Sequence, residues 1–386
     1  MRPNWLVLYK MKEIGIGLIG FGMMGKIHTY AYRNLPLYYR DLPFRVKLVG
    51  VCSGHLANAC LARDELGYEF ATDNYQEILD RSDIDVVNIC TPNNLHHEMI
   101  LAAIAAGKNI YCDKPLTVNS SQAAEIIDAL EGRSLIHQVA LQNRFFPATM
   151  RARQLVEEGR IGKVMSFRAV YLHAGSVNPG LPTGWKLDAR TSGGGVLLDL
   201  GSHVLDLIYF LLGEFSQVIA RSRVIYPQRP DQSGKLQDIQ AEDSILVLAE
   251  MKDGSQGSIE ASKVATGIND ELRFEIHGDR GAIRFNLMEP GWLDYYDNTQ
   301  PERSLGGNRG FTRIECIGRY DPPGGSFPSG KASVGWLRGH VHCLYRFLDC
   351  VSAQKQASPS FHEGAYIQNV MAKIYESDRT GQWQHC

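Results

Sequence analysis

The sequence predicts an α/β protein in two parts: an N-terminal domain built on a parallel sheet, and a C-terminal α+β domain with a large, mostly antiparallel open sheet. Two observations support this prediction. In the first third of the chain, short apolar runs alternate with helical segments, as in right-handed βαβ units. After residue 150, strand-like runs follow one another, joined by Gly and Asp turns. For the 386 residues we expect an extension at 1–12 and domains at 13–142 and 143–386.

The first domain is expected to alternate strand and helix throughout. Apolar and β-branched runs predict its strands, at 13–20, 45–53, 85–91, 109–115 and 135–143. Helical periodicity, with Gly107 and Gly132 as stop residues, predicts its helices, at 23–35, 56–66, 75–80, 95–106 and 120–132. Residues that directly follow these strands are candidates for ligand contacts, because ligands of open α/β sheets bind outside the carboxyl ends of the strands.

The second domain should open with a helix and turn over 148–162 and contain one strongly apolar helix at 196–212. Alternating patterns predict its strands, at 163–173, 217–226, 243–251, 254–264, 272–278 and 281–287. The segment 289–335 is rich in Gly and Pro, so we expect it to be irregular. Two helices, at 340–351 and 362–378, should close the chain.

Composition is that of a soluble globular protein, with 44% hydrophobic and 21% charged residues and a net charge of -2. There is no basic stripe, so neither nucleic acid nor a membrane surface is an expected partner. The N-terminal stretch lacks the pattern of a signal peptide. The eight cysteines form no C-x-x-C pair and fit no zinc-ligand spacing, so we expect buried thiols in the cytoplasm and no metal.

A glycine motif follows the first strand and opens the first helix. It reads G-F-G-M-M-G and comprises Gly20, Phe21, Gly22, Met23, Met24 and Gly25. In this position it predicts a dinucleotide site: the first glycine makes the tight turn, the second admits the pyrophosphate, and the third allows close helix packing. The first N–H groups of the helix would face the phosphates. The alternative is a tight turn without a ligand.

The end of the second strand does not settle which dinucleotide binds. The acid that usually contacts the adenosine ribose is missing, because the chain reads Ser53-Gly54-His55 there. An NADP site would need a nearby Arg or Lys for the extra phosphate, and this loop has neither. We therefore expect NAD or NADP, with Ser53 and His55 as candidate contacts; His55 could meet a 2′-phosphate, although an isolated histidine is more often a surface residue.

Two further strand ends carry polar residues. In C-T-P-N-N-L-H-H-E, Pro92 bends the chain so that Thr91, Asn93 and His96 could contact the cofactor, although a capped helix entry would look similar. In Y-C-D-K-P, Asp113 and Lys114 follow the next strand, where a cis bond to proline would aim the lysine. An ordinary solvated lysine is the alternative interpretation.

The apolar helix holds three ionisable residues, Asp199, His203 and Asp206, at spacings of four and three that place them on one face. Burying such groups is costly unless they are paired or hydrogen-bonded. They either satisfy one another as a structural network or face a cleft as an acid/base pair, and the stretch alone favours neither.

Taken together, the pieces GLIGFGMMGKIH, CTPNNLHHE, CDKPL, GGGVLLDLGSHVLDL and PSFHEGA resemble the Gfo/Idh/MocA oxidoreductase family, which includes inositol dehydrogenase and glucose–fructose oxidoreductase. The resemblance implies a Rossmann dinucleotide-binding domain and a second domain whose open sheet supports homodimers or homotetramers. It also implies NAD or NADP, with NAD slightly favoured.

The resemblance further implies that Lys114, Asp199 and His203 are catalytic, with Asp113 in place of the family's glutamate. His203 would take the proton of a substrate hydroxyl, and Lys114 would stabilise the developing alkoxide. Asp199 would bind an adjacent hydroxyl or hold His203, and Asp206 would be structural. The further candidates for the wall of the substrate site are Asn143, Arg144, Tyr171, Trp185 and Lys186.

The function expected from this resemblance is an NAD(P)-dependent dehydrogenase that oxidises a secondary hydroxyl of a cyclic polyol, sugar or glycoside. One alternative is a redox-neutral sugar-modifying enzyme, of epimerase or glycosidase type, that retains its cofactor. Another is a non-enzymatic protein that senses a dinucleotide or sugar. A requirement for stoichiometric coenzyme would separate the first from the other two.

Overall fold

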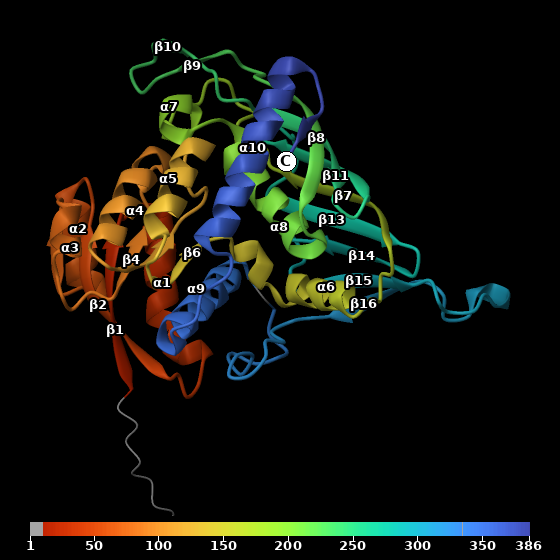
Figure 1. The fold of residues 1–386 in the computed structure, drawn as a ribbon, viewed down its shortest axis with the longest axis horizontal. Coiled ribbons are helices and arrows are strands. Elements are labelled where there is room, and N and C mark those ends of the chain that lie inside the picture. Colours follow the sequence, from red (N-terminus) through yellow and green to blue (C-terminus); the bar gives the residue numbers. More distant parts are fainter. Residues whose placement is uncertain (1–10, 334) are drawn as a thin grey trace, which may run out of the picture.

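The computed structural model describes residues 11–333 and 335–386. Figure 1 shows two lobes, each built on its own sheet, with the C-terminal helices between them. The first ten residues of the expected extension lie outside the described part. The extension ends earlier than predicted, because β1 (Lys12–Ile19) already begins at Lys12.

The first lobe contains six parallel strands in the order β3-β2-β1-β4-β5-β6. The strands are β1, β2 (Phe44–Cys52), β3 (Phe70–Thr72), β4 (Val86–Ile89), β5 (Asn109–Cys112) and β6 (His137–Val139). The helices are α1 (Met23–Tyr38), α2 (Leu56–Leu66), α3 (Tyr75–Leu79), α4 (His96–Ala105) and α5 (Ser120–Leu130). The predicted doubly wound Rossmann sheet is confirmed, and its strand order reverses between β1 and β4, where a ligand crevice is expected.

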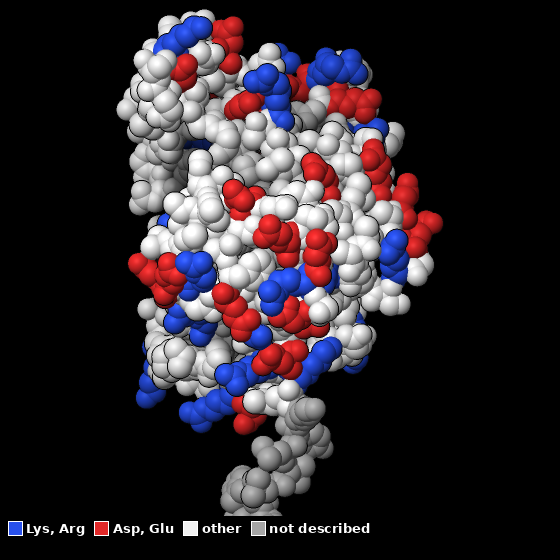
Figure 2. Space-filling model, turned by 90° about the vertical axis from the view of Figure 1, so that its left-hand side faces the viewer, with Lys and Arg blue, Asp and Glu red and all other residues white. Residues whose placement is uncertain are grey.

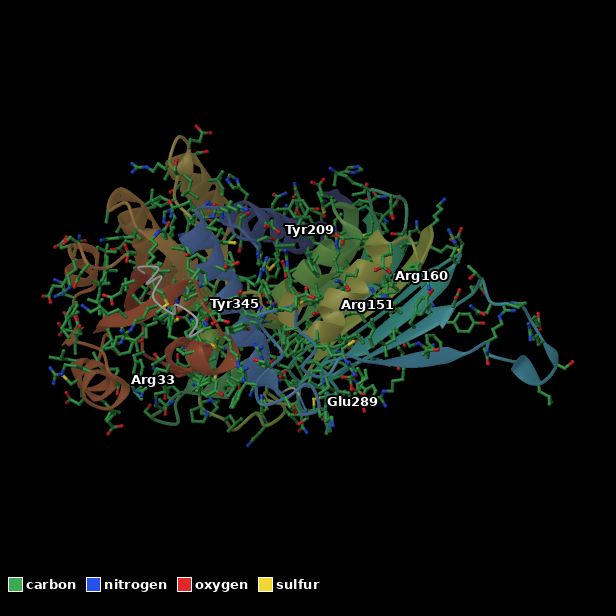
Figure 3. All side chains as sticks on the ribbon, turned by 90° about the horizontal axis from the view of Figure 1, so that it is seen from below. Arg33, Arg151, Arg160, Tyr209, Glu289 and Tyr345 are labelled. Carbon is green, nitrogen blue, oxygen red and sulfur yellow. The ribbon has the colours of Figure 1, made fainter. Side chains whose placement is uncertain are left out.

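One helix of the second segment belongs to the first sheet. α9 (Trp336–Ala353) packs against α1, and its Val341, Leu344 and Phe347 share one core cluster with Ile14 and Ile16 of β1. Tyr345 of α9, labelled in Figure 3, lies on the side facing the first lobe. Its ring stacks on that of Tyr39, with centroids 3.8 Å apart. The segment 143–386, which was predicted to form only the second domain, therefore also supplies a helix, α9, that covers the first sheet.

The second lobe contains nine strands in the order β16-β15-β14-β13-β7-β12-β11-β8-β17. Every neighbouring pair is antiparallel except β7 and β12, so the predicted mostly antiparallel sheet is confirmed. The strands are β7 (Val164–Leu172), β8 (Phe215–Arg223), β11 (Ser244–Met251), β12 (Gln256–Ser262), β13 (Glu271–Gly278), β14 (Gly281–Asn286), β15 (Trp292–Asp297), β16 (Phe311–Glu315) and β17 (Gln384–His385). Helices α6 (Pro147–Glu157), α8 (Ser202–Leu212) and α10 (Phe361–Thr380) pack against this sheet.

The sequence prediction missed several strands. β15 and β16 lie inside 289–335, so the expectation that this whole segment is irregular was wrong. The short edge strand β3 and the hairpin of β9 (Gln228–Pro230) and β10 (Leu236–Asp238) were also missed. Each of these three strands has only three residues, which is too short for an alternating pattern to stand out.

The predicted apolar helix forms the centre of the second core. It begins as a π-helical turn, η4 (Leu197–Gly201), and continues as α8. By length and apolar composition alone, the run Ala189–Leu212 could cross a membrane. In the structure, however, 78% of its most apolar 18-residue stretch is buried inside the fold. It is therefore a core helix of this lobe.

Charge on the first lobe is mixed. On the side shown in Figure 2, Lys and Arg alternate with Asp and Glu and do not gather into a field of one sign. This distribution agrees with the formal net charge of -2.

Candidate active site

A cleft of about 960 Å³ lies between the two lobes, at the upper end of the usual range for small-molecule sites. It runs from the glycine turn after β1 to the start of η4. The predicted site residues that line it are Gly20, Phe21, Gly22, Met23, Met24, Ser53, His55, Thr91, Pro92, Asn93, Asp113, Lys114, Tyr171, Lys186, Asp199 and His203. Four others, Gly25, His96, Asn143 and Arg144, are not part of its lining.

The glycine turn fits a dinucleotide. Gly20 has a φ of +98°, and a side chain there would collide with the backbone of Cys90. Around Gly22, a Cβ would meet nothing within 4 Å, so the backbone is open to an approaching pyrophosphate. Gly22 is the N-cap of α1, with no side-chain cap and no acid in the first turn, which leaves its N–H groups free for an anion.

Gly25 has the packing role expected of a third glycine. Its Cβ would lie 2.2 Å from the carbonyl oxygen of Gly20, so the helix could not approach the strand with any side chain there. Its assignment to direct cofactor contact is corrected to this indirect role.

His96 was also expected to contact the cofactor, but it is fully buried behind the cleft wall. Its ring nitrogens lie 2.9 Å from the carbonyl oxygen of Pro115 and 3.0 Å from that of Thr91. The ring therefore ties together the two loops that carry Thr91 and Lys114, and its role is to position them.

Lys114 is brought into the cleft by the turn after β5. The Lys114–Pro115 bond is cis, as the sequence suggested. The Asp113 carboxylate accepts a hydrogen bond from the backbone N–H of Lys114 at 2.9 Å. Only 15% of the lysine side chain is exposed, and burial lowers the pKa of its ammonium group, opposed chiefly by Asp199.

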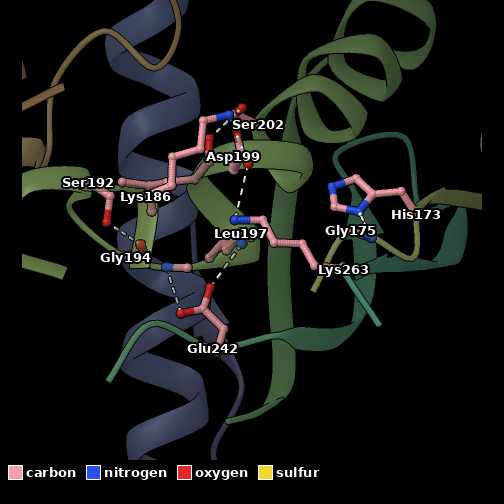
Figure 4. A network of polar contacts seen from close by, with 12 residues as sticks. His173, Gly175, Lys186, Ser192, Gly194, Leu197, Asp199, Ser202, Glu242 and Lys263 are labelled. Carbon is pink, nitrogen blue, oxygen red and sulfur yellow. Dashed lines mark hydrogen bonds and ion pairs between the residues drawn. The ribbon is translucent and has the colours of Figure 1, made fainter. Parts of the chain in front are cut away.

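The three glycines before η4 are required by close packing. Gly193 has a φ of +85°. A Cβ on Gly194 would lie 2.1 Å from the Tyr375 hydroxyl, and one on Gly195 would lie 2.2 Å from the carbonyl oxygen of Glu242. The buried Glu242 carboxylate accepts hydrogen bonds from the N–H groups of Gly195 and Leu197, both at 2.9 Å (Figure 4). This anchor fixes where the π-helical turn begins, and π-helical turns are frequent at functional sites.

Asp199 emerges from that turn among Lys114, Lys186 and Lys263, of which Figure 4 labels the last two. Its Oδ1 lies 3.0 Å from both Lys114 Nζ and Lys186 Nζ, and its Oδ2 lies 3.1 Å from Lys263 Nζ. Lys114 Nζ also donates to the Asp199 carbonyl oxygen. Burial alone would raise the pKa of Asp199, but the lysines, Lys114 first, hold it well below its usual range. The carboxylate is therefore charged at every physiological pH.

His203 lies one turn beyond Asp199 and is 5% exposed. Burial, reinforced by the charge of Lys114, holds the pKa of its imidazole well below the usual value. The ring is therefore neutral near pH 7 and can accept a proton. Its Nδ1 is buried without a hydrogen bond among the described residues, which leaves Nε2 as the nitrogen for the cleft.

Arg144 was proposed as a substrate contact, and the structure contradicts this. Its guanidinium is buried in a network that joins three helices: Nε lies 2.8 Å from Asp206 Oδ2, and Nη1 lies 2.7 Å from Glu363 Oε1. Asp206 is thus structural, as expected. Asn143 is likewise buried outside the cleft lining, and the neighbouring Gln142 lines the cleft in its place.

Sequence reasoning missed several cleft residues because they come from elements far apart in the chain. Those on the substrate side are Gln142, His173, Asp270, Trp336 and His340, whereas Trp185, which the sequence placed in the wall beside Lys186, does line the cleft. The buried Lys263, directly after β12, was missed although it pairs with Asp199. Its only sequence signal is a lysine at the end of an alternating strand. Among residues 11–333 and 335–386, no cluster of three or more His, Cys, Asp or Glu could hold a metal ion.

Comparison with known proteins follows the same division into lobes. Residues 14–141 match a model described as an oxidoreductase family with an NAD-binding Rossmann fold, and residues 149–284 match the GFO/IDH/MocA C-terminal domain. A levoglucosan dehydrogenase from Pseudarthrobacter phenanthrenivorans is 33% identical over 97% of this chain and 98% of its own. An inositol 2-dehydrogenase from Rhizobium meliloti is 29% identical over 72% of this chain and 77% of its own.

Solved structures agree with these matches. A levoglucosan dehydrogenase in complex with NADH and levoglucosan superposes with a TM-score of 0.92 at 32% identity, and the match covers 97% of this chain and 99% of that one.

Proposed function

Because the chain belongs to the Gfo/Idh/MocA family of oxidoreductases, we propose that its cleft oxidises a secondary hydroxyl of a cyclic sugar, polyol or glycoside with NAD or NADP. The observation that carries the proposal is the meeting of Lys114, Asp199 and a neutral His203 on the wall that continues from the glycine turn. A base and a cation side by side are what removal of a hydroxyl proton requires.

The reaction removes a proton from the hydroxyl and a hydride from the same carbon. When bound, the coenzyme supplies the hydride acceptor. Neutral His203 takes the hydroxyl proton at Nε2. The Lys114 ammonium donates to the hydroxyl oxygen and stabilises the charge that builds on it as the proton leaves. Asp199 holds the lysine in this position through the 3.0 Å ion pair.

The charge balance of the site favours an uncharged substrate. Three lysines, Lys114, Lys186 and Lys263, lie near the reacting end around Asp199, and together with that carboxylate those of Asp113 and Asp270 in the lining match their formal charge, so no net positive charge is left for a sugar acid. The remaining lining includes the polar Gln142, His173 and Asp270 and the aromatic Trp185 and Trp336. Polar groups that pair with hydroxyls and flat apolar surfaces suit a sugar ring. We therefore place neutral pyranosides and anhydrosugars, such as the levoglucosan used by the relative, first among the candidates.

A coenzyme-reduction screen tests the proposal. The protein would be mixed with NAD or NADP and with levoglucosan, methyl glucosides, inositols or glucose, and absorbance followed at about 340 nm. We expect reduction with at least one sugar, at least about 100-fold slower in Lys114→Met. Lys47→Met, a surface lysine paired with Glu69, is the matched control and should match the wild type. Coenzyme binding without reduction for any substrate would refute net oxidation and favour redox-neutral sugar chemistry or sensing.

We further propose a homodimer formed by the outer face of the large sheet. That face has an apolar centre of Val170, Ile219, Leu246 and Leu248, with Leu246 and Leu248 more than half exposed. Charges of both signs surround it: Arg168, Arg221, Arg273, Glu260 and Glu275. A second copy related by two-fold symmetry would cover the centre and pair these charges.

Light scattering tests the dimer: the wild type should have twice the chain mass, and Leu246→Glu with Leu248→Glu should run as a monomer. A monomeric wild type would contradict it.

We also place the enzyme in the cytoplasm, since all eight cysteines are free thiols in the structure. Fractionation of the source cells would check that placement, and recovery outside the cytoplasm would contradict it.

A further inference from the structure

We propose that Asp73 takes the place of the missing acid after β2, so that it binds the adenosine ribose and makes the site select NAD over NADP. The proposal deepens the proposed function, since it rests on the cleft being a coenzyme site. It concerns one side chain that the sequence did not single out, supplied by a neighbouring strand.

The sheet register brings Asp73 to the right place. β2 and β3 are parallel neighbours in which Cys52 pairs with Thr72, and the N–H of Ser53 donates to the Thr72 carbonyl oxygen at 3.1 Å. Asp73 follows Thr72, so it leaves its strand beside the turn that begins at Ser53. Both residues line the cleft.

The Asp73 carboxylate is available for a ligand. It is exposed, and it makes no hydrogen bond or ion pair with any other described residue; the cap of α3 is made by Asn74 instead. The negative charge of Asp73 acts on the end of β2. Burial raises the pKa of the Cys52 thiol to about 11, and the charge of Asp73 contributes more to that rise than the charge of Glu77 does. A ribose diol lying over Ser53 would find an acceptor for two hydroxyl groups.

The same end of the cleft offers no lysine or arginine to a 2′-phosphate. The lining residues there are Ser53, Gly54, His55, Asn58, Asp73 and Tyr75, with no Lys or Arg among them. Arg63, on the helix α2 that follows this turn, is paired with Asp64 at 2.8 Å. Asp73 is the only one of these lining residues that is an Asp, Glu, Lys or Arg, so the formal charge at this end is the negative one on its carboxylate. A phosphate would be repelled where a hydroxyl is bound.

The test is a comparison of coenzyme binding in Asp73→Asn, Asp73→Ser and wild type. Binding of NADH and NADPH at pH 8 would be measured by nicotinamide fluorescence, with no sugar present. We expect the wild type to bind NADH at least 50-fold tighter than NADPH, and each Asp73 variant to reduce that ratio at least tenfold. Glu77→Gln removes the same charge one helical turn away, outside the lining, and should change the ratio less than threefold.

Thermal melts would establish that every variant is folded. A wild type that binds NADPH as tightly as NADH, or Asp73 variants with an unchanged ratio, would overturn the proposal. The outcome is separate from that of the proposed function. Selective NADH binding without oxidation of any sugar would refute only the proposed reaction, whereas sugar oxidation with equal use of both coenzymes would refute only the role of Asp73.

Discussion

The replacement Arg144→Met should destabilise the protein severely while leaving its chemistry intact. The guanidinium and the Asp206 carboxylate are 4% and 2% exposed, with contacts of 2.8 and 2.5 Å. Methionine fills much of the same space but leaves the carboxylate buried without its cation. Breaking a buried pair in this way costs about 3–5 kcal/mol of the free energy of unfolding.

A second replacement separates the lost pair from the stranded charge. Burial opposes the attraction of Arg144 and raises the pKa of Asp206, and desolvation of a buried pair generally offsets much of what the pairing contributes. Neutralising the aspartate as well, in Arg144→Met with Asp206→Asn, should therefore recover about 1–3 kcal/mol of the loss. A double variant as unstable as the sum of both single variants would contradict this account.

The assays are urea unfolding followed by circular dichroism, and substrate titration of the folded protein. Since Arg144 does not line the cleft, the KM for the sugar should stay within about twofold of wild type. The reasoning is refuted if Arg144→Met loses less than about 1 kcal/mol of stability, or if it keeps full stability and raises KM tenfold or more. The second result would restore the substrate role suggested by the sequence.

Three other results are expected. Oxidation needs a neutral His203 and a charged Lys114, and burial lowers the pKa of both groups. On the acid side kcat/KM should therefore fall only well below pH 6.5, and on the alkaline side its fall should begin below pH 10.5. An acid limb at or above pH 6.5 would contradict the burial argument. Lys263→Met removes one of three cations from Asp199, so kcat should fall about tenfold while the melting temperature stays nearly unchanged. A variant with the kcat of the wild type would show that the contact between Lys263 and Asp199 does not contribute to catalysis. Gly195→Ala places a Cβ 2.2 Å from a backbone carbonyl oxygen and should cost about 1–3 kcal/mol in urea unfolding, whereas wild-type stability would mean that the loop yields freely.

Local patterns were sufficient to predict most of the fold. Five of the six strands of the first sheet follow from apolar runs alternating with helices, and α2 begins and ends at the predicted residues, Leu56 and Leu66. The packing of α9 on the first sheet could not be predicted, since nothing in an amphipathic helix says which of two cores it will cover. The sequence lacked information on which sheet α9 would pack against in the folded protein.

The candidate site divides in the same way. Lys114 and His203 lie in stretches whose motifs are contiguous, so a family resemblance could identify them. Lys263 and Asp73 lie in stretches with no such motif. Strand register alone brings Lys263 to Asp199 and Asp73 to the cleft. Arg144 was misassigned because a charged residue after a strand looks the same in sequence whether it faces a ligand or a buried carboxylate.

The most direct measurement of the central claim is the fate of the hydrogen removed from the sugar. Fully carbon-deuterated levoglucosan, or whichever sugar the screen selects, would be incubated with the enzyme and oxidised coenzyme, and the reduced coenzyme would be examined by mass spectrometry. The account predicts one deuterium per reduced coenzyme, a slower rate than with unlabelled sugar, and no product from His203→Ala. Sugar that is altered without net coenzyme reduction, or reduced coenzyme that carries no deuterium, would contradict it.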